Sequence, residues 1–212
     1  MNTQAHWQRI YGTKSPEETS WYEPHLLSSL DWITSTTKDK AASIIDVGGG
    51  QSTLVDDLLA IGHRALTVLD LASAAIEKSQ ERLGPAAESV VWLVGDVTTV
   101  ALPARTYDVW HDRAVFHFLI DPEQRAAYVR QVASALTSDG QVVIATFGPE
   151  GPQKCSGLPT RRYDEKLLQY EFGPNFRLVR TSIVEHRTPM ETSQQFLYCH
   201  FSFAPTHKGS TS

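Results

Sequence analysis

Residues 43–54 decide the fold, and they read Ser-Ile-Ile-Asp-Val-Gly-Gly-Gly-Gln-Ser-Thr-Leu. Isoleucine and valine fill most of 43–47, which is typical of a central parallel strand that is buried on both faces. The three glycines that follow allow a sharp turn and a close approach to a ligand, because they carry no Cβ. Ser52 or Thr53 can then cap a helix over 52–62. The stretch therefore predicts a strand, a glycine turn and a helix whose first N–H groups point above the strand.

Two further predicted strands carry an acid at the same end. Asp70 closes a strand over 65–70 and lies 22 positions after Gly48, close to the ~20 expected for a carboxylate that binds ribose hydroxyls. The next strand, 90–95, leads directly into Asp96. We expect these acids and the glycine turn to share one rim of a parallel sheet, although an ordinary sheet with acidic strand ends is the alternative.

Strand and helix patterns alternate along most of the chain, which predicts a parallel sheet with helices on both faces. The remaining elements are predicted at helix 72–84, strand 107–111, a helix from Pro122, strand 141–146, helix 163–172, and strands 176–186 and 194–203. No helix separates the last two strands, so at least one should run antiparallel. The region 147–162 is too rich in glycine and proline for a helix or a strand, and such a loop is expected to shape a substrate site.

Composition restricts the class of protein and its partners. A formal charge of −5 argues against a surface that binds nucleic acid. No apolar run reaches the ~18 residues that a bilayer requires, and the first residues lack the basic and apolar pattern of a secretory signal. Cys155 and Cys199 are too few for a disulfide framework. We expect a cytoplasmic protein with reduced thiols and with no membrane or nucleic-acid partner.

Aromatic side chains gather in the first 25 residues, among them Trp7, Tyr11, Trp21 and Tyr22. They precede a helical pattern in which leucines and Ile33 share one face. In one interpretation the aromatic residues attach an N-terminal helix to the sheet. In the other, Trp21 and Tyr22 fold over the ligand as a lid. The two interpretations are compatible.

Taken together, these features resemble the class I S-adenosylmethionine-dependent methyltransferases, and in particular small bacterial members whose acceptors are mostly undefined. The resemblance rests on the glycine turn, on Asp70, on Gly95-Asp96-Val97 and on the final strand pair, with further similarity at 20–24, 111–119 and 155–159. It implies a Rossmann-like seven-stranded sheet, mostly parallel, in the order 3-2-1-4-5-7-6, with the last strand antiparallel and helices on both faces. It further implies one methyltransferase domain over 1–212, comprising a lid and helix (1–40), a cofactor-binding half (41–147), a substrate-side half (148–203) and a tail (204–212).

The same resemblance assigns S-adenosylmethionine to the carboxyl ends of the first strands. Gly48 and Gly50 would contact its methionine and ribose part, and Asp70 would accept both ribose hydroxyls. Asp96 would accept the adenine amino group while the Val97 N–H donates to the ring. The full set of implied cofactor-binding residues is Trp21, Asp46, Gly48, Gly49, Gly50, Ser52, Asp70, Leu71, Asp96 and Val97. Ser52 departs from the glycine of many relatives, but its small hydroxyl should fit.

Methyl transfer is an in-line displacement, so the protein must align the acceptor and remove a proton where the acceptor carries one. Asp112 follows the fourth strand, beside the expected methyl position, and His117 is a plausible base with an unperturbed pKa of ~6.5. Tyr22 could line the same space, which makes these three the candidate catalytic residues. The alternative is structural: Asp112 pairs with Arg113 or Arg161, and His117 only packs.

Cys155 suggests arsenic or another thiophilic acceptor, but two cysteines cannot assemble a multi-cysteine metalloid site. No ligand-spaced His/Cys cluster supports a metal site either. We therefore interpret Cys155 as a packing residue of its loop.

A small-molecule methyl acceptor is the leading hypothesis, because the chain adds no accessory domain to the core and lid. A protein lysine methyltransferase is the first alternative, since the same fold and an acid after the fourth strand would serve it. A NAD(P)-dependent oxidoreductase is a weaker alternative, because its fingerprint needs Gly or Ala where Thr53 stands. The last alternative is a non-catalytic protein that only binds the cofactor.

Overall fold

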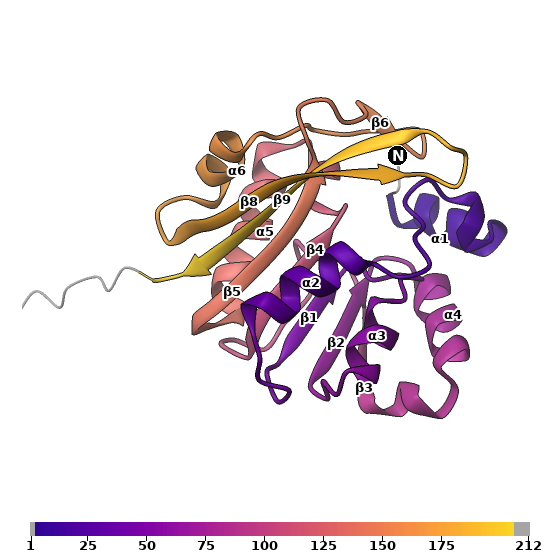
Figure 1. Cartoon of the computed structure of the whole chain (residues 1–212), viewed down its shortest axis with the longest axis horizontal. Helices are drawn as coiled ribbons and strands as arrows, with labels where there is room; N and C mark the ends of the chain where they lie inside the picture. The colour runs from indigo at the N-terminus through magenta and orange to yellow at the C-terminus, as the bar shows by residue number, and fades with distance from the viewer. Residues whose placement is uncertain (1–2, 206–212) are drawn as a thin grey trace, which may run out of the picture.

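The structure, a computed structural model, describes residues 3–205, and its centre is a seven-stranded sheet (Figure 1). The strands of this sheet are β1 (Ile44–Val47), β2 (Leu66–Asp70), β3 (Val90–Val94), β4 (Tyr107–Arg113), β5 (Leu136–Phe147), β8 (Phe176–Arg187) and β9 (Ser193–Phe203). Their spatial order is β3-β2-β1-β4-β5-β9-β8, which is the predicted 3-2-1-4-5-7-6 when the sheet's strands are counted along the chain. β9 runs antiparallel to both β5 and β8. The predicted topology is therefore confirmed.

β1 occupies the middle of the parallel half because its side chains are apolar on both faces. It pairs in parallel with β2 and with β4, and all four of its residues are buried. Ile44 packs into the core on one face of the sheet and Ile45 into the core on the other. The glycine turn after Val47 consequently opens at the centre of the carboxyl edge.

Helices cover both faces, as predicted. They are α1 (Thr3–Thr13), α2 (Leu27–Thr36), α3 (Leu54–Ala60), α4 (Ser73–Leu83), α5 (Pro122–Ala135) and α6 (Glu165–Phe172). α2, α3 and α4 contribute to one hydrophobic core, through side chains such as Ile33, Leu58 and Ile76. α5 and α6 contribute to the other, through Tyr128 and Phe172. Figure 1 shows α2 and α3 in front of the sheet and α5 behind it.

α1 stands apart from the helices that flank the middle of the sheet and lies beside α4 (Figure 1). Its buried side chain, Tyr11, packs against Ala72 and Ala75 at the start of α4, together with Trp7. Lys78 on α4 donates a hydrogen bond to the backbone carbonyl of Tyr11. These contacts bring the N-terminal aromatic residues to the carboxyl edge of β2.

The region 147–162 differs from the expectation that it contains no strand. Two short strands, β6 (Lys154–Cys155) and β7 (Leu158–Pro159), pair antiparallel within it. Ser156 and Gly157 between them have φ of 49° and 80°, the backbone signs of a tight two-residue hairpin turn. The prediction was wrong here because strands of two residues leave no alternating pattern in a sequence.

Of the tail predicted over 204–212, residues 206–212 lie outside the described part of the chain. Within residues 3–205, no helix combines the length and the apolar character needed to traverse a bilayer.

Candidate active site

A cavity of ≈ 180 Å³ opens at the carboxyl edge of the sheet. Side chains from the ends of β1 to β5, from α1 and from the N-terminal segment line it. A smaller cavity of ≈ 50 Å³ adjoins it. Both cavities are lined by Tyr11, Trp21, Gly48 and Arg113, so these four residues stand at their junction.

The glycine turn forms the floor of this junction, and its conformation excludes side chains. Gly48 has a φ of 70°, and a Cβ there would collide with Cγ2 of Val115. Gly50 has a φ of 44°, and a Cβ there would lie 2.9 Å from both Oδ2 of Asp70 and the hydroxyl oxygen of Tyr11. The turn can therefore approach Asp70 and the cavity only because it lacks side chains.

Asp70 ends β2 at the wall of the larger cavity and is 5% exposed. Its Oδ1 accepts a hydrogen bond of 2.8 Å from the Ala72 N–H. Burial raises the pKa of Asp70 to about 7, although the hydrogen bond from Ala72 acts to lower it. The charge of Asp46 adds to the increase. A buried carboxylate of this kind gains stability from ligand groups that donate hydrogen bonds to it.

Leu71, Asp96 and Val97 line the larger cavity beside Asp70. The carboxylate of Asp96 accepts hydrogen bonds from the backbone N–H (2.8 Å) and the hydroxyl (2.7 Å) of Thr98. These bonds fix its orientation. Three successive strand ends thus bring their polar groups to one rim, as the spacing of the acids predicts.

The smaller cavity is lined by three further residues of the expected cofactor-binding set, Asp46, Gly49 and Ser52. Asp46 is 5% exposed, and its Oδ1 lies 2.7 Å from Nδ1 of His111. Nε2 of His111 lies 2.9 Å from the hydroxyl of Ser29. The imidazole therefore holds the Asp46 carboxylate in place.

Nine of the ten residues expected to bind the cofactor line one or both cavities. Gly50 is not among the described lining residues, and the Asp70 carboxylate and the Tyr11 hydroxyl lie close against it. The geometry thus brings the predicted set together, and the contact of each residue with the cofactor remains a prediction.

The N-terminal segment covers the junction of the two cavities. The ring of Trp21 lies 5.7 Å from that of Trp7 and 6.3 Å from that of Tyr11. Sequence reasoning did not assign Trp7 and Tyr11 to the site, although both line the larger cavity. The concentration of aromatic residues before position 25 was the signal that could have identified them.

An ion-pair network holds this segment in place. The Arg113 guanidinium donates to the Trp21 carbonyl at 3.0 Å and to the Glu23 carboxylate at 2.8 Å. Nδ1 of His186, on β8, lies 2.9 Å from the same Glu23 oxygen. Burial alone would raise the pKa of Glu23, but the hydrogen bond from His186 and the charge of Arg113 lower it overall.

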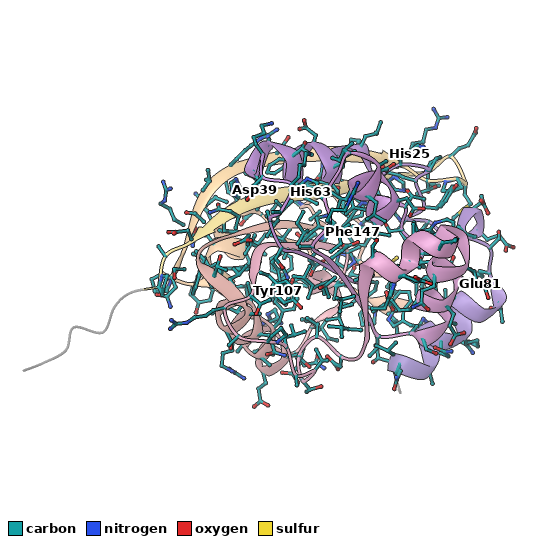
Figure 2. All side chains as sticks on the ribbon, turned by 90° about the horizontal axis from the view of Figure 1, so that it is seen from below. His25, Asp39, His63, Glu81, Tyr107 and Phe147 are labelled. Atoms are coloured by element: carbon teal, nitrogen blue, oxygen red, sulfur yellow. The ribbon has the colours of Figure 1, made fainter. Side chains whose placement is uncertain are left out.

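The end of the larger cavity away from Asp96 is lined by Phe118, Phe147, Cys155 and Phe196. Phe147, labelled near the middle of the view in Figure 2, is buried. Burial raises the pKa of the Cys155 thiol, so this thiol is neutral at physiological pH. This end of the cavity is therefore aromatic and largely apolar.

A family model described as nodulation protein S matches residues 17–156, which is more than half of the chain. The chain belongs to the nodulation protein S family. The crystal structure of the N-methyltransferase NodS from Bradyrhizobium japonicum WM9 with S-adenosylhomocysteine has a TM-score of 0.73 and 14% identity, covering 97% of this chain and 100% of that one. That likeness shows a shared fold. The resemblance to class I S-adenosylmethionine-dependent methyltransferases is confirmed, and S-adenosylmethionine is the cofactor of that class.

Two curated relatives match similar shares of this NodS-family chain. A malonyl-[acyl-carrier protein] O-methyltransferase of Anoxybacillus flavithermus is 33% identical over 140 residues, which is 63% of this chain and 51% of the relative. An eEF1A lysine and N-terminal methyltransferase of Mus musculus is 22% identical over 138 residues, which is 65% of this chain and 19% of the relative. The chain thus spans about half, or less, of the length of these relatives.

Asp112, predicted as catalytic, has a structural position in this NodS-family member. It is completely buried and is absent from the described lining of both cavities. Its carboxylate accepts hydrogen bonds from the N–H groups of Val115 (2.8 Å) and Phe116 (3.1 Å) and from the Tyr128 hydroxyl (2.6 Å). Three donors occupy the carboxylate, so Asp112 fixes the turn after β4 and has no access to an acceptor. The alternative ion pair with Arg113 or Arg161 is not formed either, since these pair with Glu23 and Glu171.

His117 is likewise buried and lies outside the described cavity lining. Its Nδ1 accepts a hydrogen bond of 3.1 Å from the Phe147 N–H, and its ring stacks on that of Phe147 at 4.1 Å. Burial lowers the pKa of His117 to about 3, with the charge of Arg113 adding to the decrease. A neutral imidazole whose one acceptor nitrogen is occupied cannot take a proton from an acceptor. The geometry matches the alternative in which His117 packs and positions Phe147.

Tyr22 lines the smaller cavity, beside Glu23 and Ser52. Tyr22 is not among the described residues that line the larger cavity, which contains the aromatic end. Across residues 3–205, no group of three His, Cys, Asp or Glu side chains is arranged to hold a metal ion.

Proposed function

We propose that this protein transfers a methyl group from S-adenosylmethionine to a small-molecule acceptor. The observation that carries the proposal is the continuous cavity at the carboxyl edge. At one end it presents the Asp70 and Asp96 carboxylates, and at the other an aromatic wall that includes Phe196. A cofactor and an acceptor would occupy these two ends.

The described residues fit the cofactor on structural grounds. Asp70 is a buried carboxylate held by backbone N–H groups, among them that of Ala72, and its oxygens can still accept ribose hydroxyls. Gly48 lines both cavities, and its positive φ and its contact with Val115 leave no room for a side chain there. When bound, S-adenosylmethionine supplies a methyl carbon activated by a positive sulfur. The chain itself binds, orients and excludes water, with Trp21 covering the junction of the cavities.

The N-terminal segment supports a small acceptor. Trp7, Tyr11 and Trp21 pack together over the cavity and form its cover. Glu23, in the same segment, pairs with Arg113 and His186 of the sheet. A cover built from the chain's own side chains suits an acceptor that is enclosed rather than one attached to a large folded protein. The second candidate is a protein lysine methyltransferase, which is favoured by the similarity to the mouse eEF1A lysine and N-terminal methyltransferase.

Incubation with methyl-labelled S-adenosylmethionine separates the two candidates. The purified chain is given either a protein-free metabolite extract or the protein fraction of the same cells. We expect label in the metabolite fraction only. Label confined to protein bands would replace the small-molecule proposal with the second candidate. A matched reaction with Asp70→Asn provides the background, because this variant should bind the cofactor weakly.

A further inference from the structure

The aromatic end of the larger cavity lacks a free base. Asp112 is occupied by three donors, the acceptor nitrogen of His117 is occupied by the Phe147 N–H, and neither lines the cavity. Among the described lining residues, the acids of the larger cavity are Asp70 and Asp96, at the ends of β2 and β3. An acceptor at the aromatic end therefore meets no group placed to remove a proton from it.

A single fixed cation lies beside this end, at the junction of the two cavities. Among the described residues that line either cavity, Arg113 is the only lysine or arginine. Its side chain is 6% exposed, and its guanidinium lies 4.7 Å from the ring centroid of Phe196. Its bonds to the Trp21 carbonyl, the Glu23 carboxylate and the Tyr198 hydroxyl leave further donors among the five N–H groups of a guanidinium. A planar anion is the ligand that such a group binds best.

We propose that the methyl acceptor is a carboxylic acid with an apolar or aromatic body, and that it is methylated on a carboxylate oxygen. This inference rests on the proposed function. Arg113 would bind the carboxylate, and the walls formed by Phe118, Phe147 and Phe196 would bind the body. A carboxylate is ionised at neutral pH, whereas an alcohol, an ammonium or a thiol of ordinary pKa must first lose a proton.

The reaction balances without a base. A carboxylate oxygen forms a bond to the methyl carbon while the sulfur–carbon bond breaks and its electron pair remains on sulfur. The acceptor loses its negative charge, the sulfonium loses its positive charge, and no proton is released. The product is a methyl ester.

Alkali lability of the product tests the inference. The chain is incubated with methyl-labelled S-adenosylmethionine and a protein-free metabolite extract, and the small-molecule fraction is then treated with mild base. A methyl ester releases its label as volatile methanol. Label that stays in the small molecules after alkali would overturn the carboxylate inference and leave the proposed function standing. Absence of label from every small molecule would contradict both the carboxylate inference and the proposed function.

Substitution of Arg113 gives a second test, with the carboxylic acid recovered from the first as the probe. We expect Arg113→Gln to weaken calorimetric binding of this acid by about tenfold or more, since a charge-assisted pair is lost. Affinity for S-adenosylhomocysteine should change less than acceptor affinity. Arg177→Gln, on an exposed position of β8, is the matched control and should change neither. Arg113→Gln that binds the acid normally, or that loses only cofactor affinity, would contradict the inference.

A pH profile supplies a readout that does not depend on a stable variant. At saturating S-adenosylmethionine, the unmodified chain should methylate the acid at a rate that is flat from about pH 6 to 8.5, because the acceptor has no proton to lose. A rate that rises tenfold per pH unit across this range would show that a proton is removed, and would overturn the inference.

Discussion

The burial of the Asp70 carboxylate predicts how the proposed binding of the cofactor should depend on pH. Its pKa is raised to about 7 by burial, from an ordinary 3.8, so ionising it destabilises the cofactor-free fold as pH rises through this interval. Ribose hydroxyls would stabilise the ionised form. Cofactor binding should therefore release a proton near neutral pH and should strengthen as pH increases.

We predict that the affinity for S-adenosylhomocysteine increases between pH 6 and 8 in the unmodified chain. Asp70→Asn should weaken binding by at least about tenfold, because charge-assisted hydrogen bonds are lost, and should abolish the pH dependence. Calorimetry at several pH values measures both effects. Glu81→Gln is the control, since Glu81 is exposed on α4 (Figure 2). Unchanged affinity in Asp70→Asn would refute the assignment of Asp70 to the ribose.

Substitution of Gly48 tests whether the same turn requires a residue without a side chain. An alanine there would require a positive φ and would push its Cβ into Val115. Backbone strain and overpacking together should lower the free energy of unfolding by about 2–5 kcal/mol, measured by urea denaturation. Gly84→Ala is the matched control, because Gly84 also has a positive φ, 56°, but has no atom within 4 Å of a Cβ. An equal loss in both variants would mean that the contact with Val115 contributes nothing.

At the scale of elements, the N-terminal segment is joined to two strands of the sheet through one acid. Glu23 bonds Arg113 at the end of β4 and His186 near the end of β8. Both partners are nearly buried, with side-chain exposures of 6% and 3%. Glu23 thus links the cover of the cavity to the sheet.

Glu23→Gln should loosen this cover without unfolding the sheet. We expect amide hydrogen exchange over residues 14–25 to become about tenfold faster, because a neutral amide replaces a charge-assisted pair. Exchange in β1 and β4 should stay unchanged. Glu17→Gln, on an exposed residue of the same segment, should leave exchange as it is. Equal protection in Glu23→Gln would show that aromatic packing alone holds the segment.

Elements with a long local pattern could be predicted from the sequence, and those that depend on distant contacts could not. The glycine turn, Asp70 and Asp96 follow from strand-to-strand spacing, so the sequence alone predicts their common rim. The role of Tyr11 depends on α4, more than sixty residues later in the chain, where Lys78 bonds its carbonyl. The same limit applies to Asp112, whose three hydrogen-bond donors are set by the turn and by α5.

For the whole molecule, the cavity joins parts that otherwise belong to separate cores. Tyr11 packs with the start of α4, Val97 belongs to the core under α5 and α6, and Phe196 packs with Trp32 of α2. Tyr11, Val97 and Phe196 all line the larger cavity. A ligand that fills it therefore contacts three hydrophobic clusters at once, and its binding energy adds to the stability of the entire fold.

S-adenosylhomocysteine at one hundred times its Kd should stabilise the native state by ~2.7 kcal/mol. For a chain of this size, that gain corresponds to a Tm increase of about 5–10 °C, which a thermal-shift assay detects. NAD at the same concentration should leave Tm unchanged, because Thr53 stands where a dinucleotide fingerprint needs Gly or Ala. Asp70→Asn should show a smaller shift with S-adenosylhomocysteine than the unmodified chain. An equal Tm increase with NAD and with S-adenosylhomocysteine would favour a dinucleotide site. The cavity would then recognise the adenosine part that both ligands share and not the amino-acid part of S-adenosylhomocysteine.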